Sequence, residues 1–274
     1  MLSAASWGSG DFAGGLSSRK VGAYRAVFFA DFFGLLILVF ASFFYREGFP
    51  SVNRTIVSAL GGMLGTLGLL ILYYSLSKGQ MSIAAPISAL FAALLPVIVG
   101  GITEGLPSLL QLIGFVVALA AVWLISQGNS GEKFSLRRLA DLRLPLLAGL
   151  GFGSYFILMH IAVKDSDATL WPMIISRLGG TVLLGLIILM RRESMGVPRG
   201  AWTVVLLNAT LDLTGNLFYI LASKTGRLDI AAILSSLYPG ATVILAWVIL
   251  RERIKLPQWM GILAALLAIV LFTV

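Results

Sequence analysis

The chain has 274 residues, of which 58% are hydrophobic and 12% are charged, and its mean hydropathy is +0.97. Soluble domains carry roughly 25% charged residues, so this composition excludes a soluble globular protein, whose surface it could not cover with polar groups. The net charge of +8 is carried by short loops, which indicates anionic lipid rather than nucleic acid as the partner. The lack of cysteine excludes disulfides and thiolate metal sites, and the single histidine excludes a multi-histidine metal site.

Ten apolar runs are predicted as membrane-spanning helices, because each approaches the roughly 20 residues that a bilayer requires. In chain order they cover residues 2–18, 24–44, 55–76, 82–101, 108–126, 144–163, 169–190, 201–222, 229–250 and 257–274. Most connections between them are short and contain turn residues. We therefore expect an all-α integral membrane protein without a cofactor, in the plasma membrane of a prokaryote.

One connection, residues 127–143, is longer, polar and basic, and it divides the chain into residues 1–126 and 144–274, with five predicted spans each. Serine, glutamine and glycine residues recur at one constant spacing in the two parts, where Ser88, Gln111 and Gly114 correspond to Ser235, Gln258 and Gly261. Since five is odd, two copies of one unit must have opposite orientations in the membrane. This organisation is typical of secondary transporters with inverted repeats, which bind substrate near the midplane between the repeats.

Charged side chains within predicted spans mark candidate functional positions, since they are costly in a bilayer and usually face a cavity or a partner. Asp31 and Arg177 occupy corresponding places in the two copies. One hypothesis is that they line opposite mouths of one pathway or form part of a charge network across it. The alternative is that each lies near a helix end and reaches headgroups or water.

The eighth predicted span carries a polar stripe, because Asn208, Asp212 and Asn216 recur every four residues and Tyr219 continues the pattern. This spacing places them on one helical face. The stripe is interpreted either as a cavity wall that binds substrate or carries a proton, or as a set of hydrogen bonds between helices. The corresponding face of the third span predicts close helix packing through Gly62, Thr66 and Tyr73.

The first span carries Asp11 directly after the sequence Trp-Gly-Ser-Gly. A desolvated carboxylate there would exchange a proton in the neutral range, which suits proton-coupled antiport; the alternative is a hydrogen-bonded structural acid. His160 lies near the end of the sixth span, where a place at the membrane interface is favoured over proton relay. Trp7 and Tyr155 are candidate aromatic walls of a cavity.

The fourth and ninth spans contain three prolines, Pro86, Pro96 and Pro239, each of which removes a backbone donor and predicts a helix kink. Such breaks are tolerated where they line a cavity, and the alternative is a kink required by packing. We expect these spans to form the core of the pathway, together with their polar side chains Ser88, Ser235 and Tyr238.

Several short segments recur in a defined order: Trp-Gly-Ser at 7–9, Ile-Ser-Arg at 175–177, Ser-Leu-Tyr-Pro at 236–239, and Leu-Arg-Glu-Arg at 250–253 followed by Gln258 and Gly261. In these segments and in its repeated order, nearly the whole chain resembles the EamA-type transporters of the drug/metabolite transporter superfamily. The resemblance implies movement of a small metabolite, an amino acid, a nucleotide-like compound or a drug. Two positions depart from the family pattern: Asp31 stands where arginine is usual, and Glu104-Gly105 where Glu-Arg is usual.

The sequence therefore predicts a secondary transporter that moves a small polar or amphipathic metabolite or drug by alternating access, driven either by a proton gradient or by no ion gradient. Two alternatives stay open, a flippase for a lipid-like substrate and a scaffold or partner subunit whose polar stripes are consumed in helix contacts. No P-loop is present, and an enzyme is not expected. The distribution of basic loops favours both termini outside, whereas the resemblance implies both inside.

Overall fold

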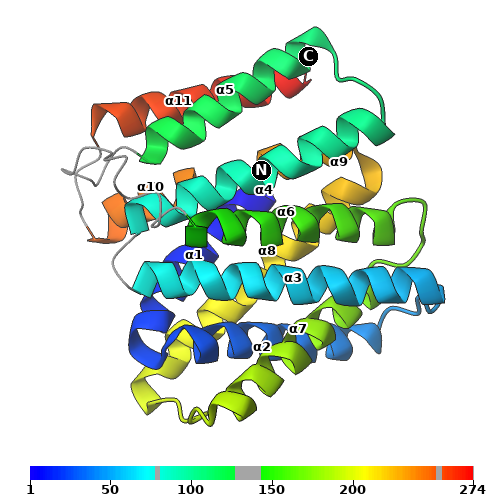
Figure 1. Cartoon of the computed structure of the whole chain (residues 1–274), viewed down its shortest axis with the longest axis vertical. Coiled ribbons are helices and arrows are strands. Elements are labelled where there is room, and N and C mark those ends of the chain that lie inside the picture. Colours follow the sequence, from blue (N-terminus) through cyan, green and yellow to red (C-terminus); the bar gives the residue numbers. More distant parts are fainter. Residues whose placement is uncertain (78–80, 127–142, 251–254, 274) are drawn as a thin grey trace.

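The computed structural model describes residues 1–77, 81–126, 143–250 and 255–273, and within these ranges the chain folds into helices and their connections (Figure 1). The helices are α1 (Leu2–Val21), α2 (Ala23–Ser42), α3 (Val52–Ser77), α4 (Met81–Thr103), α5 (Leu109–Ser126), α6 (Arg143–Val163), α7 (Leu170–Arg191), η2 (Arg199–Ala201), α8 (Trp202–Thr225), α9 (Leu228–Ser235), α10 (Tyr238–Leu250) and α11 (Leu256–Thr273). The all-α prediction is confirmed for the described residues. The predicted basic connection 127–143 and the Arg-Glu-Arg segment lie almost entirely outside them.

Six of the described helical stretches are long and apolar enough to cross a membrane: 23–42, 52–75, 143–163, 170–191, 199–225 and 228–249. Shorter apolar stretches cover 88–103, 109–125 and 256–268. Large apolar side chains also point outward, as Phe40, Ile98, Val116, Leu189 and Leu263 do on five different helices. A soluble monomer rarely exposes so much apolar surface, so lipid is the expected surroundings. The count of ten spans stays a prediction.

The ninth predicted span, 229–250, corresponds to the apolar stretch 228–249, but it is not one continuous helix. It forms α9 and α10, which are separated by Ser236 and Leu237. Pro239 is the second residue of α10, in the first turn, where a helix has no use for the missing backbone donor. By contrast, α4 is one helix that includes Pro86 and Pro96, although the side chain of Pro86 lies outside those described.

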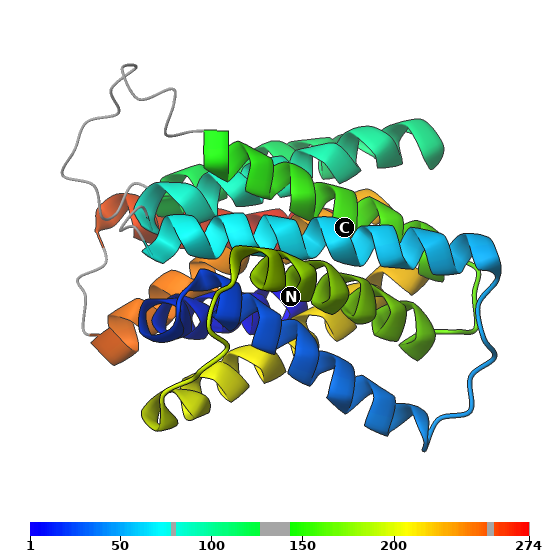
Figure 2. The ribbon, with the colours of Figure 1, turned by 60° about the horizontal axis from the view of Figure 1, so that its bottom comes forward.

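The helices pack in a regular order across the molecule. α5 and α11 lie side by side at one end of the view in Figure 1, and α2 and α7 lie at the other. Figure 2 shows α3 running between α6 and α7. The remaining extensive contacts join α1 to α8 and α10, α2 to α8, and α4 to α6 and α9.

Glycines allow α3 to approach its neighbours closely. A Cβ atom at Gly65 would lie 2.9 Å from the Tyr155 ring, and one at Gly62 would collide with the backbone carbonyl of Ser176. Glycine at these positions lets α6 and α7 pack directly against the α3 backbone. The predicted close packing of the third span is therefore confirmed for this face.

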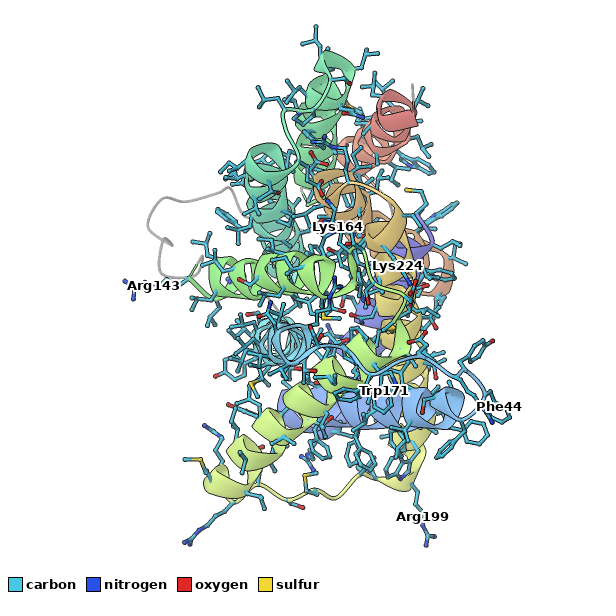
Figure 3. All side chains as sticks on the ribbon, turned by 90° about the vertical axis from the view of Figure 1, so that its right-hand side faces the viewer. Phe44, Arg143, Lys164, Trp171, Arg199 and Lys224 are labelled. Carbon is cyan, nitrogen blue, oxygen red and sulfur yellow. The ribbon has the colours of Figure 1, made fainter. Side chains whose placement is uncertain are left out.

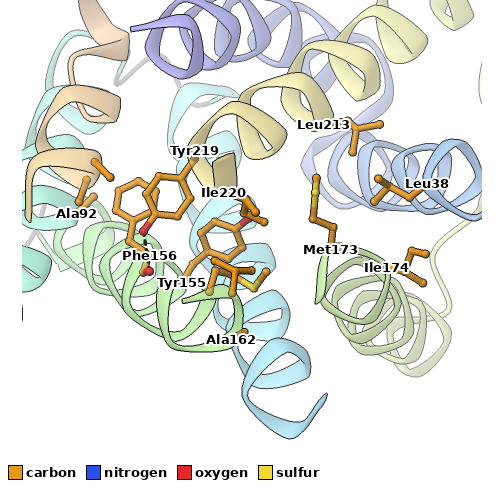
Figure 4. Close-up of a cluster of buried hydrophobic side chains, with 14 residues drawn as sticks. Leu38, Ala92, Tyr155, Phe156, Ala162, Met173, Ile174, Leu213, Tyr219 and Ile220 are labelled. Carbon is orange, nitrogen blue, oxygen red and sulfur yellow. Dashed lines mark hydrogen bonds between the residues drawn. The ribbon is translucent and has the colours of Figure 1, made fainter. Parts of the chain in front are cut away.

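A buried apolar cluster joins α2, α4, α6, α7, α8 and α9 (Figure 4). In it the rings of Phe156 and Tyr219 lie 4.6 Å apart, and the Tyr219 hydroxyl donates a hydrogen bond of 2.7 Å to the Phe156 carbonyl. Met173 on α7 and Leu213 on α8 pack into the same cluster. This packing fixes the helices that carry the charged residues described next.

Candidate functional site

A cavity lies among the middle parts of the helices and is lined by residues of α1, α2, α3, α6, α7, α8 and α10. Its empty volume is about 620 Å³, including the space at its mouth. The lining residues are Trp7, Asp11, Asp31, Gly62, Gly65, Thr66, Leu69, Phe152, Tyr155, Phe156, Ser176, Arg177, Asp212, Asn216 and Tyr238. The structure therefore gathers charged and aromatic side chains from distant parts of the sequence around one space.

Arg177 on α7 joins two carboxylates in this lining. Its Nη1 donates to Asp31 Oδ1 on α2 and its Nη2 donates to Asp212 Oδ2 on α8, both at 2.5 Å. All three side chains are buried, with residue exposures of 3–7%. A planar guanidinium with fixed donors can hold two carboxylates at once, which an ammonium does less well. Asp31 and Arg177 thus form a charge network, one of the two arrangements that the sequence predicts, and do not sit at separate mouths.

Neutral side chains complete this network. The Thr66 hydroxyl donates to Asp31 Oδ2 at 2.6 Å, and Asn216 Nδ2 donates to the Asp212 carbonyl at 2.6 Å and to its Oδ2 at 3.3 Å. Gly180 leaves the room for this arrangement, because a Cβ there would lie 2.7 Å from Asp31 Oδ2. The sequence assigned Thr66 to packing alone, so its contact with Asp31 was missed.

Asp11 differs from the other two carboxylates of the lining. It is partly buried on α1 and lies within electrostatic range of Asp212. Within the described ranges, no hydrogen bond or ion pair holds its carboxylate, whereas Arg177 holds both Asp31 and Asp212. Among the described residues, Asp11 therefore lacks the hydrogen bonds that the alternative prediction of a structural acid requires.

The polar stripe of α8 divides between the two predicted roles. Asp212 and Asn216 line the cavity. Asn208 and Tyr219 are fully buried and serve helix contacts instead, since Asn208 Oδ1 accepts a 2.8 Å hydrogen bond from Tyr73 on α3 and Tyr219 donates to the backbone of α6. The two residues in the middle of the stripe thus reach the cavity, and the residues about one turn before and after them bind neighbouring helices.

The fourth and ninth predicted spans contribute one side chain to the lining. Tyr238, at the start of α10, faces the cavity, and its hydroxyl lies 3.2 Å from the Ser88 hydroxyl on α4. Ser235 is buried at the end of α9, outside the lining. The two spans therefore meet at the cavity through the Ser88–Tyr238 contact, and Pro239 follows directly behind it.

Aromatic rings form one wall. Trp7 stacks on Phe156 with ring centroids 5.4 Å apart, and Tyr155 lies 6.1 Å from Phe156. Gly215 on α8 makes room for the indole ring, because a Cβ there would collide with it. Trp7 and Tyr155 therefore line the cavity, and Phe156 is an aromatic residue that the sequence analysis did not single out.

A second polar network lies at the helix ends that face the viewer in Figure 3, where Lys164 is labelled. Glu104 pairs with Lys164, lies 3.1 Å from His160 Nε2, and accepts a 2.9 Å hydrogen bond from the Leu228 backbone. Burial raises the pKa of Glu104, but these hydrogen bonds and the nearby positive charge outweigh it and hold the pKa below its usual value. His160 is buried, and its Nδ1 lies 2.7 Å from the Ser223 hydroxyl. We call Glu104, His160 and Lys164 the end network.

A protein-family model for the EamA-like transporter family matches residues 1–127 and 142–274. The chain belongs to the EamA-like transporter family. Its members are membrane transporters, which agrees with the apolar surface and the polar cavity described above. The family match thus confirms the resemblance drawn from the sequence.

This EamA-like protein is also similar to a curated protein and to a solved structure. An uncharacterized protein of the archaeon Methanocaldococcus jannaschii is 27% identical over 131 residues, which is 48% of this chain and 94% of the relative. A solved crystal structure superposes with a TM-score of 0.74 over 99% of this chain and 96% of the other, at 13% identity. At that identity the superposition shows a shared fold.

Proposed function

We propose that this EamA-like protein is a secondary transporter of a prokaryotic plasma membrane that carries a small polar or amphipathic solute by alternating access. The observation that carries the proposal is the cavity itself, in which Arg177 bridges Asp31 and Asp212 while Asp11 is left without a partner among the described residues. Ionisable groups within membrane helices are costly and are retained where they serve a solute or ion pathway. A scaffold would consume its polar groups in helix contacts, as Asn208 and Tyr219 do here.

The packing of the helices supports the inverted five-plus-five repeat. If α1–α5 correspond in order to α6, α7, α8, α9 with α10, and α11, exchanging the two sets leaves the main contacts unchanged. The α3–α6 contact becomes α8–α1, α3–α7 becomes α8–α2, and α2–α7 and α5–α11 become themselves. The family match in two blocks and the relative of half this length fit the same division, with copies at 1–126 and 144–274.

The ion-pair network joins these two copies. Asp31 and Thr66 belong to the first copy, whereas Arg177, Asp212 and Asn216 belong to the second. In alternating access the copies move relative to each other around a central site. We propose that the Asp31–Arg177 pair keeps the copies in register at the cavity, and that Asp11 binds the solute or the coupling proton.

The test is flux in vesicles that contain the purified full-length protein. Uptake and efflux of a panel of labelled metabolites are measured with and without a pH gradient. At least one solute is expected to move, and Arg177→Gln and Asp31→Asn are each expected to reduce its flux to the level of empty vesicles. Removing one partner leaves a buried charge uncompensated, which costs about 3–5 kcal/mol.

Matched controls separate this effect from a general loss of charge. Arg199→Gln and Asp165→Asn make the same chemical changes at exposed positions, and both should transport normally. All variants are compared at equal amounts of folded protein in the vesicles. Normal flux by both Arg177→Gln and Asp31→Asn, or no flux of any solute by the unmodified protein, would overturn the proposal.

A further inference from the structure

We infer that the solute is a small organic cation with a flat apolar group, and that its ammonium lies beside Asp11 within the aromatic wall. The inference rests on the proposed function for the statement that this ligand is transported. Binding to the cavity is a separate property, which can be measured without transport.

The charge of the cavity favours a cationic solute. Among the described lining residues, Asp11, Asp31 and Asp212 are acidic and Arg177 is the one cationic side chain. Both terminal nitrogens of Arg177 are already used, one on Asp31 and one on Asp212. Among the described lining residues no cationic side chain is therefore left for Asp11, and in a membrane interior a carboxyl group without a counter-charge keeps its proton unless a cation replaces it.

The aromatic side chains around Asp11 also favour a cationic solute. Trp7 precedes Asp11 by four residues on α1, so both side chains lie on the same helical face. Phe156 extends the indole surface at a centroid distance of 5.4 Å, and Tyr238 lines the same cavity from α10. Aromatic faces attract cations, and aromatic walls beside a carboxylate are a known way to hold an ammonium group.

The same contacts disfavour the other classes of solute. An anion would need a cationic partner, but the single positive charge of Arg177 is already shared by two aspartates. A neutral solute gains no charged contact, because Asp11 then keeps its proton.

The binding test uses three ligands of similar size and different charge on the purified full-length protein in detergent. Isothermal titration calorimetry compares benzyltrimethylammonium (positive), 2-phenylethanol (neutral) and 3-phenylpropionate (negative). The ammonium ligand is expected to bind at least about tenfold more tightly than either of the others, which is about 1.4 kcal/mol, because a charged contact in a desolvated site is stronger than a neutral one.

Two pairs of variants locate the site. Asp11→Asn should weaken binding of the ammonium ligand by at least about tenfold, whereas Asp165→Asn, on an exposed loop, should leave it unchanged. Trp7→Leu should also weaken it, whereas Trp247→Leu, which removes an exposed indole, should not. Thermal melting of each variant shows whether it remains folded. Equal affinity for the three ligands, or unchanged affinity in folded Asp11→Asn, would overturn the inference.

Flux measurements in vesicles separate this inference from the proposed function. If the ammonium ligand binds through Asp11 but no solute crosses the vesicle membrane, the inference about the ligand stands and the transporter proposal fails. If the vesicles move a neutral or anionic solute and the ammonium ligand does not bind, transport stands and the inference fails. Flux of the ammonium ligand that is lost in Asp11→Asn supports both.

Discussion

Asn208 is fully buried in α8 and depends on one side-chain hydrogen bond, which its Oδ1 accepts from Tyr73. Within the described part of the chain, its Nδ2 has no hydrogen-bond partner. Gly14 on α1 provides the space for the tyrosine, because a Cβ at that position would collide with the ring hydroxyl. The contact therefore links α1, α3 and α8 next to the cavity.

Tyr73→Phe is expected to destabilise the protein by about 1–3 kcal/mol, because it leaves the buried Asn208 oxygen without a donor while keeping the ring. The measurement is thermal or denaturant unfolding in detergent. Tyr45→Phe, which removes the same hydroxyl from an exposed residue, is the control and should change little. A stability loss no larger than that of the control would mean that the hydrogen bond contributes nothing.

Single residues differ in how far their roles can be predicted from sequence. Asp31, Arg177 and Asp212 stand out because a charge within an apolar span needs a partner or a cavity. Thr66 does not stand out, because a threonine in a helix can bond to its own backbone. Its contact with Asp31 depends on the distance between α2 and α3, which no local pattern specifies.

Helix α7 is held at its first turn by a residue from another connection. The Glu47 carboxylate accepts hydrogen bonds of 2.7 Å from the backbone of Thr169 and Leu170, and the Trp171 indole donates to the Glu47 carbonyl. These bonds satisfy backbone donors that the helix itself cannot. A negative charge there also suits the positive end of the helix dipole. Since α7 carries Arg177, Glu47 contributes to the position of the charge network.

Glu47→Ala is expected to lower stability by about 0.5–2 kcal/mol, the usual effect of losing a helix cap. Unfolding in detergent measures it. Glu193→Ala removes a partly exposed acid that pairs with Arg191 near the other end of α7, and the change there should be within about 1 kcal/mol. If the two variants were equally stable, Glu47 would not act as a cap.

The helices themselves show where sequence patterns stop being informative. Apolar runs predict the existence of spans because membrane helices need length and hydropathy. The break between α9 and α10 is not visible in hydropathy, and Pro239 indicated a kink where the structure begins a new helix. The cap from Glu47 is equally invisible, because it comes from a connection more than a hundred residues away along the chain.

At the scale of the whole molecule, the end network connects parts of the chain that the repeat hypothesis assigns to different copies. Glu104 follows α4 of the first copy, while His160 and Lys164 belong to the second. Arg54 of α3 adds hydrogen bonds of 2.8 Å to the carbonyls of Ala162 and Lys164. If the copies move in alternating access, these contacts must break before the cavity opens at this end.

Composition predicts the membrane environment and the repeated order predicts the two copies, but neither predicts this network. Glu104 entered the sequence analysis only as a departure from the family pattern, and His160 as a residue at the interface. Their contact is long-range, and it depends on how α4 and α6 are placed. Whether the termini lie inside or outside also stays a prediction, since the basic loops and the family resemblance favour opposite answers.

The absence of cysteine makes the opening of this end measurable. Ser176→Cys places one thiol in the cavity, and the rate of its labelling by a membrane-impermeant maleimide reports access. Adding Glu104→Gln removes the charge that holds Lys164, so the closed arrangement should lose about 1.4 kcal/mol and labelling from this end should become about tenfold faster. Ser51→Cys places a thiol at an exposed position at the same end. Its labelling measures the fraction of protein molecules whose end network faces the side that contains the reagent.

A change of pH near neutrality cannot remove the charge of Glu104, so the test needs the Glu104→Gln substitution. Because the pKa of Glu104 lies below its ordinary value of about 4.3, the carboxylate stays ionised at neutral pH, and its stabilising contacts are lost only when the pH falls through that lowered pKa. At neutral pH the unmodified protein should therefore be labelled slowly and the Glu104→Gln form quickly. Glu193→Gln, an acid near the far end of α7, should behave as the unmodified protein. Equal labelling rates in all three would show that the end network does not control access to the cavity.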